Sequence, residues 1–248
     1  MKYIVGNWKM NLLSKDSIEL SSSINEFLKD NKVTNQVVIC PSFTLLPIVS
    51  MCIEDKKFCL GAQDCSVAER GAYTGDVSGE MLSDLGCKYV IVGHSERRRL
   101  CKETSEVVRE KAEKVYTHNM TPIICVGESL ADRDSGRTFE VLAEQVLSSL
   151  PEIQGQELII AYEPVWAIGS GMKPQESEIE SVAIFLRELI HRKFVFTKRV
   201  KILYGGSVNE NNCYSIINLE NIDGLLIGNA SLESQSFINI IKCCKEVA

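Results

Sequence analysis

Short apolar runs rich in β-branched residues recur along the whole chain, and their spacing is the feature that most restricts the fold. The runs are almost continuously apolar, which is typical of parallel strands buried on both faces. Successive runs begin about 31 residues apart on average, the length of one strand–helix–strand unit. The eight runs are Tyr3–Val5, Gln36–Cys40, Phe58–Ala62, Lys88–Val92, Pro122–Val126, Glu157–Tyr162, Val200–Tyr204 and Ile222–Ile227.

Between these runs lie segments with the periodicity of amphipathic helices. Apolar residues recur every three or four positions in 107–116, 139–150 and 179–190, which places them on one face of a helix. Shorter helices are predicted at Thr44–Ile53 and Glu80–Leu85. The chain therefore alternates strands and helices throughout its length.

Some residues at the ends of these helices are typical boundary residues. Ser14 and Ser105 are predicted N-caps, because a serine hydroxyl accepts a hydrogen bond from a free N–H of the first turn. Gly86 is predicted to end a helix, because glycine readily adopts the left-handed conformation that follows a last turn. The phenylalanines, methionines and other aromatic residues are predicted to belong to the core.

Eight strand–helix units in 248 residues leave little room for anything else. A (β/α)8 barrel typically needs about 250 residues. The alternative is a doubly wound open sheet, which favours a glycine fingerprint after the first strand, and Gly6-Asn7-Trp8-Lys9 is not one. With no linker and no low-complexity tract, the sequence predicts an α/β protein with one (β/α)8 barrel domain over residues 1–248.

The charge of the chain argues against nucleic acid as a general partner. There are 27 Lys and Arg against 33 Asp and Glu, a formal net charge of −6, whereas a phosphate backbone requires a concentrated basic face. The densest basic run is Arg97-Arg98-Arg99, between Glu96 and Glu103. We interpret it as local chemistry, with Glu96 and Arg97 forming a structural ion pair.

Membrane, export and metal signals are missing from the sequence. No segment approaches about 18 consecutive apolar residues, and polar residues interrupt the N-terminal segment 1–7 too early for a signal peptide. The ten cysteines form no CxxC pair, so free thiols in a reducing cytoplasm are expected. His94, His118 and His191 show no zinc-ligand spacing, and no metal is predicted.

Polar residues follow several of the predicted strands, and in a barrel of this kind the site lies at the carboxyl ends of the strands. We therefore expect these residues to meet at one mouth although they are far apart in the sequence. They are Asn7 and Lys9 after the first run, His94, Ser95 and Glu96 after the fourth, Glu163 after the sixth, Gly205, Gly206 and Ser207 after the seventh, and Gly228 and Asn229 after the eighth.

This set of residues favours one class of reaction. A carboxylate base beside a neutral donor suits proton abstraction next to a carbonyl, and glycine-rich turns let backbone N–H groups approach a phosphate. Taken singly, Glu163 is most simply a solvated carboxylate, His94 a loop histidine and Lys9 a surface lysine. Their coincidence at one predicted rim indicates proton transfer on a small phosphorylated carbonyl compound.

Longer motifs at these positions resemble the triosephosphate isomerase family, in order and at the expected spacing from residue 4 to residue 232. The motifs are Gly6-Asn7-Trp8-Lys9-Met10-Asn11, Gly93-His94-Ser95-Glu96-Arg97-Arg98, Ala161-Tyr162-Glu163-Pro164-Val165-Trp166-Ala167-Ile168-Gly169, Tyr204-Gly205-Gly206-Ser207-Val208 and Ala230-Ser231-Leu232. Shorter stretches at 40–41, 61–64, 71–75 and 125–128 are similar as well.

The resemblance implies a TIM barrel that interconverts dihydroxyacetone phosphate and D-glyceraldehyde 3-phosphate through an enediol(ate), without a cofactor, in glycolysis and gluconeogenesis. By matching motif, Glu163 is the base that moves the proton and His94 polarises the carbonyl. Lys9 supplies positive charge, Asn7 adds a polar contact, and Glu96 belongs to the same catalytic set. The resemblance also places Asn7, Lys9, Gly169, Ser207, Gly228 and Asn229 in the substrate-binding set.

The segment 164–174 resembles the lid of that family, with some departures. Asn229 stands where the family usually has a second glycine, yet its N–H remains available and asparagine tolerates a positive φ. Ser170 replaces the usual threonine and keeps the hydroxyl, and Met172 stands where lysine is common. We expect phosphate binding to be retained and the kinetics of the lid hinge to be altered.

The family is usually homodimeric, and Gln63–Ser78, with Thr74 near its tip, matches the loop that enters the partner. Two other functions stay open from the sequence. One is a different phosphate-binding aldose–ketose isomerase, against which the joint presence of Lys9, His94 and Glu163 argues. The other is a non-catalytic barrel that binds phosphate ligands or partners, which would tolerate loss of Glu163 or His94.

Overall fold

A computed structural model describes residues 1–53, 57–152, 156–169, 171–193 and 200–244. Eight strands form a closed barrel in the order β1 to β8, and every neighbouring pair is parallel, including the closing pair of β1 and β8. The strands are β1 (Tyr3–Asn7), β2 (Gln36–Cys40), β3 (Cys59–Ala62), β4 (Tyr89–Val92), β5 (Thr121–Val126), β6 (Leu158–Tyr162), β7 (Val200–Tyr204) and β8 (Gly224–Ile227).

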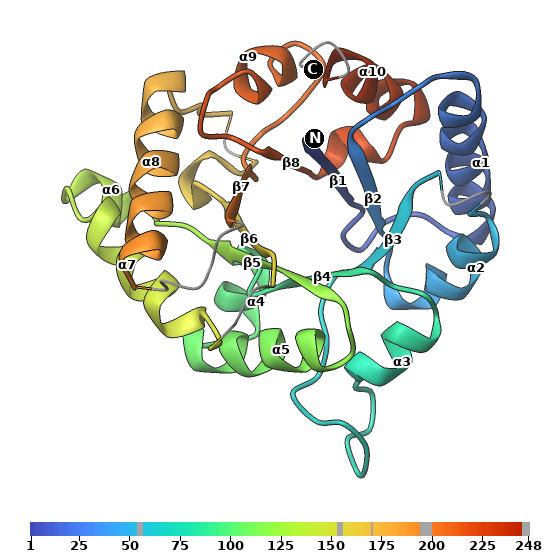
Figure 1. Ribbon diagram of the computed structural model, residues 1–248, viewed down its shortest axis with the longest axis horizontal. Helices are drawn as coiled ribbons and strands as arrows, with labels where there is room; N and C mark the ends of the chain where they lie inside the picture. The colour runs from blue at the N-terminus through green and yellow to red at the C-terminus, as the bar shows by residue number, and fades with distance from the viewer. Residues whose placement is uncertain (54–56, 153–155, 170, 194–199, 245–248) are drawn as a thin grey trace.

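Helices surround the barrel on all sides (Figure 1). The predicted (β/α)8 architecture is therefore confirmed, and so are the amphipathic segments that cover the sheet. The α-helices are α1 (Ser14–Asp30), α2 (Leu46–Met51), α3 (Gly79–Asp84), α4 (Ser95–Leu100), α5 (Ser105–Thr117), α6 (Leu130–Asp134), α7 (Thr138–Ser149), α8 (Glu176–Lys193), α9 (Cys213–Ile217) and α10 (Ser234–Cys244), with short 3-10 turns η1 (Phe43–Leu45), η2 (Val165–Ala167) and η3 (Asn229–Ser231).

The core has two layers, because each strand is buried on both faces. Side chains such as Val5, Ile91 and Ile159 fill the interior of the barrel, whereas Ile4, Ile124 and Leu186 pack between the sheet and the helices. This is the burial that the nearly continuous apolar runs predict. In the part of the chain that the structure describes, no helix is long and apolar enough to cross a membrane.

Two of the three predicted helix boundaries are wrong by one residue. Thr104, not Ser105, is the N-cap of α5, because its hydroxyl accepts from the N–H of Val107 at 3.4 Å. The hydroxyl of Ser105 instead accepts from Nη1 of Arg98 at 3.0 Å. Likewise Ser14 is the first residue of α1, and the N-cap position belongs to Leu13.

The third boundary is confirmed, since Gly86 follows α3 with φ of 86°. The prediction that methionines and aromatic residues belong to the core is wrong for several of them. Met10, Met51 and Tyr73 are 95%, 80% and 56% exposed, because they lie at the end of a short helix or on loops that no described element covers. All ten cysteines are free, as expected.

Candidate active site

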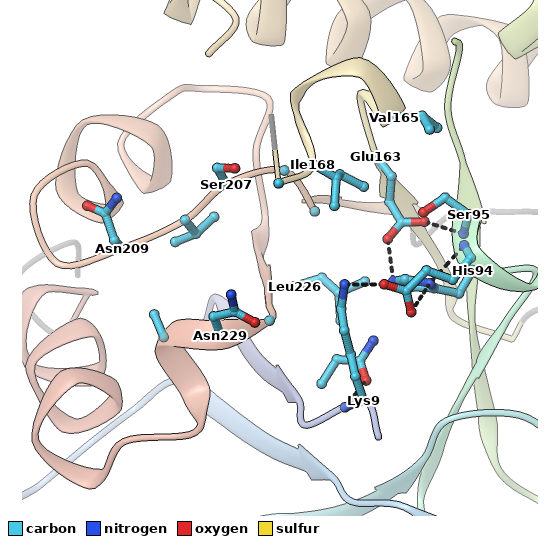
Figure 2. Close-up of a pocket in the computed structure, with 18 of the residues that line it drawn as sticks. Lys9, His94, Ser95, Glu163, Val165, Ile168, Ser207, Asn209, Leu226 and Asn229 are labelled. Atoms are coloured by element: carbon cyan, nitrogen blue, oxygen red, sulfur yellow. Dashed lines mark hydrogen bonds and ion pairs between the residues drawn. The ribbon is translucent and has the colours of Figure 1, made fainter. Parts of the chain in front are cut away.

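One cavity of about 520 Å³ opens at the carboxyl ends of the strands (Figure 2). It is walled by the segments that follow β1, β4, β6, β7 and β8. The sequence places its candidate residues in these same segments, and the structure brings all of them together. The candidate residues in the lining are Asn7, Lys9, His94, Glu96, Glu163, Gly169, Ser207, Gly228 and Asn229.

Lys9 reaches the cavity from an unusual backbone conformation. Its φ is 52°, in the left-handed region that non-glycine residues seldom occupy. Side chains from two other places hold it there: Oδ1 of Asn7 accepts from the N–H of Lys9 at 3.0 Å, and Nε2 of Gln63 donates to its carbonyl at 2.8 Å. The side chain then lies in the cavity, with Nζ 2.6 Å from Oε1 of Glu96.

Glu96 lies in the cavity beside the other residues of its expected set, and its simplest alternative role, an ion pair with Arg97, is not found. The predicted ion pair of Glu96 with Arg97 is wrong, since Glu96 pairs with Lys9 across the cavity. Arg97 turns the other way and contacts Glu103 at 2.6 Å and Asp64 at 2.9 Å. Neighbours in a sequence on a short helix project in different directions, so the fold and not adjacency decides the partner.

Glu163 and His94 form the centre of the cavity. Oε1 of Glu163 lies 2.9 Å from Nε2 of His94, and the backbone N–H of Ser95 donates to Oε2 of Glu163 at 2.9 Å. Both side chains are buried, with only 2% and 7% of their surfaces exposed. Glu163 is the first residue after β6, and a Cβ on Gly205 would lie 3.0 Å from its Cγ, so the glycine leaves room for the carboxylate.

The hydrogen bonds of His94 select one neutral tautomer. Nδ1 accepts from the backbone N–H of Glu96 at 3.2 Å at the start of α4. A neutral imidazole carries one proton, so Nδ1 as acceptor requires the proton on Nε2. The Nε2–H group therefore faces Glu163 and the cavity.

Burial and pairing act in opposite directions on the pKa values of this pair. Burial would raise the pKa of Glu163, but the charge and hydrogen bond of His94, with the N–H of Ser95, outweigh it and the net shift is downward. Burial would lower the pKa of His94, but the charge and hydrogen bond of Glu163 outweigh it and the net shift is upward. Without a ligand, the carboxylate is thus ionised and strongly attracts the imidazole proton.

The opposite wall of the cavity offers backbone donors. No hydrogen bond within the described part of the chain uses the N–H groups of Ser207, Gly228 or Asn229, which all line the cavity. Figure 2 shows Ser207 and Asn229 on the side of the cavity away from His94 and Glu163. An anion there would gain donors without breaking existing hydrogen bonds.

The segment after Glu163 lies over the cavity and is anchored at Trp166. Nε1 of Trp166 donates to Oε1 of Glu128 at 2.7 Å, and the guanidinium of Arg133 lies 3.8 Å from the centre of its ring. Gly169 lines the cavity with φ of 71°. Ser170, the residue expected to replace a threonine, lies outside the described residues.

Sequence reasoning missed several residues of this site. Gln63, which holds Lys9, and Glu128, which holds Trp166, stood in short motifs but received no role. Arg99, Val165 and Ile168 also line the cavity. Glu128 could have been found from its position after a strand, and Val165 from its position in the lid segment. Among the described residues, no group of three or more His, Cys, Asp or Glu side chains could hold a metal ion.

Comparisons with known proteins agree with this geometry. A family model described as triosephosphate isomerase matches residues 2–244. The triosephosphate isomerase of Alkaliphilus oremlandii is 41% identical over 243 residues, which cover 96% of this chain and 97% of that protein. The triosephosphate isomerase of Gluconacetobacter diazotrophicus is 42% identical over 245 residues, 98% of both chains.

A solved structure is similar over the same extent. The crystal structure of triosephosphate isomerase from Bartonella henselae superposes with a TM-score of 0.89, at 33% identity, and the match covers 98% of each chain. Family model, relatives and structure all span nearly the whole chain and converge on one name. The chain belongs to the triosephosphate isomerase family.

Proposed function

We propose that this chain interconverts dihydroxyacetone phosphate and D-glyceraldehyde 3-phosphate, with Glu163 as the base. The observation that carries the proposal is the buried contact between Glu163 and the Nε2–H of His94, in a cavity that also holds a lysine and free backbone donors. The reaction moves one proton between adjacent carbons through an enediol(ate), so it requires a base and a donor to the substrate oxygens. Both are present, and no cofactor is needed.

Glu163 acts only after it leaves its resting partners. In the ligand-free arrangement its oxygens are engaged by His94 and by the N–H of Ser95. A substrate that enters between Glu163 and His94 separates them and removes the interaction that lowers the pKa of the carboxylate. Burial then dominates and raises that pKa, which makes Glu163 a stronger base.

His94 stays a neutral donor in the same event. When Glu163 turns away, the charge that raises the pKa of His94 is lost, and burial lowers it. The imidazole then presents Nε2–H to the carbonyl oxygen and stabilises the developing oxyanion. This family is the familiar example of a glutamate base paired with a neutral histidine, and the hydrogen bond to Nδ1 of His94 favours the Nε2–H tautomer that this pairing requires.

The remaining residues bind the reacting carbons and the phosphate of the substrate. Lys9 places a positive charge beside the reacting carbons, with Asn7 holding its backbone and Glu96 its ammonium group. The phosphate lies against the N–H groups of Ser207, Gly228 and Asn229, and the N–H of Gly169 joins them when the lid closes. Closure excludes water and protects the enediol(ate), a role for which this family is again the familiar example.

We also propose a homodimer in which Gln63–Ser78 enters the partner. Figure 1 shows the chain between β3 and α3 extending away from the barrel. Residues 71–76 at its tip are all exposed, Thr74 among them, and such a projection is more stable when a partner covers it. Sedimentation velocity should give a dimer, and Thr74→Arg should shift it toward monomer; an unchanged distribution in the variant would exclude this loop as the contact.

Two further expectations belong to the same proposal. Residues 1–248 form one domain, so unfolding in urea should follow a single transition by fluorescence and by circular dichroism. The chain works in the cytoplasm, a reducing compartment that suits ten free thiols. Recovery of the protein with a periplasmic or secreted marker after cell fractionation would contradict that location.

A coupled assay tests the activity itself. Glyceraldehyde 3-phosphate is supplied, and dihydroxyacetone phosphate is followed through an NADH-linked reductase. Wild-type protein should turn over the substrate, and Glu163→Gln should lower kcat by about 10²–10⁴-fold, or roughly 3–5 kcal/mol, the usual contribution of a general base. Turnover that survives Glu163→Gln would disprove the role of Glu163, and a folded wild type without turnover would favour a non-catalytic phosphate-binding barrel.

A further inference from the structure

The three consecutive arginines of the sequence, Arg97, Arg98 and Arg99, differ in their contacts. Arg97 forms ion pairs with Asp64 and Glu103. Arg98 is largely buried, and its guanidinium donates to the carbonyls of Gly93 and Cys125 and to two serine hydroxyls. Arg99 is exposed, lines the cavity, and has no hydrogen bond or ion pair with any described residue.

The other charged or titratable side chains of the cavity lie in pairs. Lys9 contacts Glu96 at 2.6 Å, and His94 contacts Glu163 at 2.9 Å. With His94 neutral, this set carries a formal charge of −1, from one lysine and two glutamates. Arg99 brings the formal charge of the described lining to zero, and it is a cation of that lining with no partner among the described residues.

The rest of the molecule does not favour the approach of an anion. The whole chain carries a formal net charge of −6, so its long-range field repels a triose phosphate, which is a dianion at neutral pH. A local positive charge at the mouth of a cleft focuses the field and raises the rate of encounter. An unpaired guanidinium suits this task, because no neighbouring carboxylate cancels its charge.

We propose that Arg99 is the residue that steers the dianionic substrate into the cavity, an inference that rests on the proposed function. Arg99 acts on the encounter step through its charge, before the substrate reaches Lys9 and the backbone donors. It is a steering residue and takes no part in proton transfer. The requirement is for positive charge at this position and not for a guanidinium.

The test compares Arg99→Gln and Arg99→Lys with the wild type, using glyceraldehyde 3-phosphate in the coupled assay. At about 10 mM ionic strength the Debye length is about 30 Å, and Arg99→Gln should lower kcat/KM by about 3- to 10-fold with kcat unchanged. At about 1 M salt the Debye length falls to about 3 Å, and the difference from wild type should disappear. Arg99→Lys should restore at least half of the low-salt kcat/KM.

Arg192→Gln is the matched control for net charge. Arg192 lies in the last turn of α8, at the end of the barrel opposite the cavity, with its side chain 77% exposed beside Glu188. Removing it changes the net charge equally and should leave kcat/KM unchanged. An equal fall in both variants would overturn the proposal in favour of a global charge effect.

Other outcomes would also overturn the proposal. A loss that falls on kcat, persists in high salt or is not restored by lysine would assign Arg99 to direct contact with the reacting substrate. A shifted sedimentation coefficient of Arg99→Gln would assign it to a subunit contact. Wild-type turnover is measured in the same series, so failure of the proposed function appears separately, as a wild type without activity.

Discussion

The two ends of the barrel hold their carboxylates in different ways. At the carboxyl end, Glu163 is held by a titratable histidine and by one backbone N–H. At the amino end, Asp223 is held by Nη2 of Arg187 at 2.7 Å, by Nζ of Lys201 at 3.0 Å and by the N–H of Ile202 at 3.0 Å. Burial would raise the pKa of both carboxylates, yet the pKa of each is lowered because these partners outweigh it.

The difference lies in what can release the carboxylate. Asp223 pairs with the basic side chains of Arg187 and Lys201, which belong to α8 and to the strand β7 beside it. The partner of Glu163 loses its charge on deprotonation and faces a cavity that a ligand can enter. The pKa is lowered for both carboxylates. Asp223 nevertheless belongs to a fixed structural contact, whereas Glu163 belongs to a pair that a ligand can separate.

The two ends also differ in whether their hydrogen-bond donors have partners. At the amino end the hydroxyl of Tyr3 donates to Oε1 of Glu157 at 2.5 Å, and the hydroxyl of Tyr116 donates to the carbonyl of the same residue at 2.7 Å. At the carboxyl end, the N–H groups of Ser207, Gly228 and Asn229 have no partner among the described residues. Donors are satisfied where strands are tied together and left free where a ligand binds.

Two substitutions test this comparison, and His94→Gln should have a larger effect on the protein than Asp223→Asn. Glutamine keeps a neutral donor but not the imidazole, and we expect kcat to fall by about 10²–10³-fold, the usual result of losing a donor to a developing oxyanion. The variant also removes the main influence that lowers the pKa of Glu163, so burial should raise that pKa. The acid limb of the kcat/KM profile should therefore move to higher pH.

A pH profile from pH 4 to pH 9 measures this effect, with urea unfolding as a check on folding. In the wild type, the raised pKa of His94 contributes stability below the ordinary value near 6.5. That contribution is lost as pH rises through the folded value. The His94→Gln variant should not show this loss of stability as pH rises. An unshifted acid limb would mean that His94 does not control Glu163.

Much of this fold follows from the sequence, because the apolar runs are set by burial on both faces. The run Val200–Tyr204 coincides with β7, and Ile222–Ile227 begins only two residues before β8. Site residues were found because strand ends meet at one mouth. Contacts between distant segments could not be predicted, such as those of Arg97 with Asp64, of Arg98 with Cys125 and of Lys9 with Glu96. The left-handed backbone of Lys9 was not predicted either, because one of the two contacts that hold it comes from the distant Gln63.

Asp223→Asn should have a smaller effect, on stability alone. Removing this carboxylate takes away the negative charge that Arg187 and Lys201 share, and hydrogen bonds to charged groups contribute about 1.5–3 kcal/mol each. Because Asp223 is partly exposed and an asparagine oxygen still accepts, we expect a loss of about 2 kcal/mol in the free energy of unfolding. The kcat of the folded variant should stay unchanged, since Asp223 lies at the opposite end from the cavity.

The dependence on pH and a surface control complete this test. The pKa of Asp223 is lowered in the folded chain, so its contribution is present above the ordinary value of 3.8. It is lost as pH falls through the folded value. The stability gap between wild type and variant should thus be constant above about pH 5 and shrink in acid. Glu188→Gln breaks the exposed pair with Arg192 and should cost less than about 1 kcal/mol. Equal losses for both variants in urea titrations would mean that the amino end of the barrel holds Asp223 no more firmly than the surface does, and the contrast between the two ends would fail.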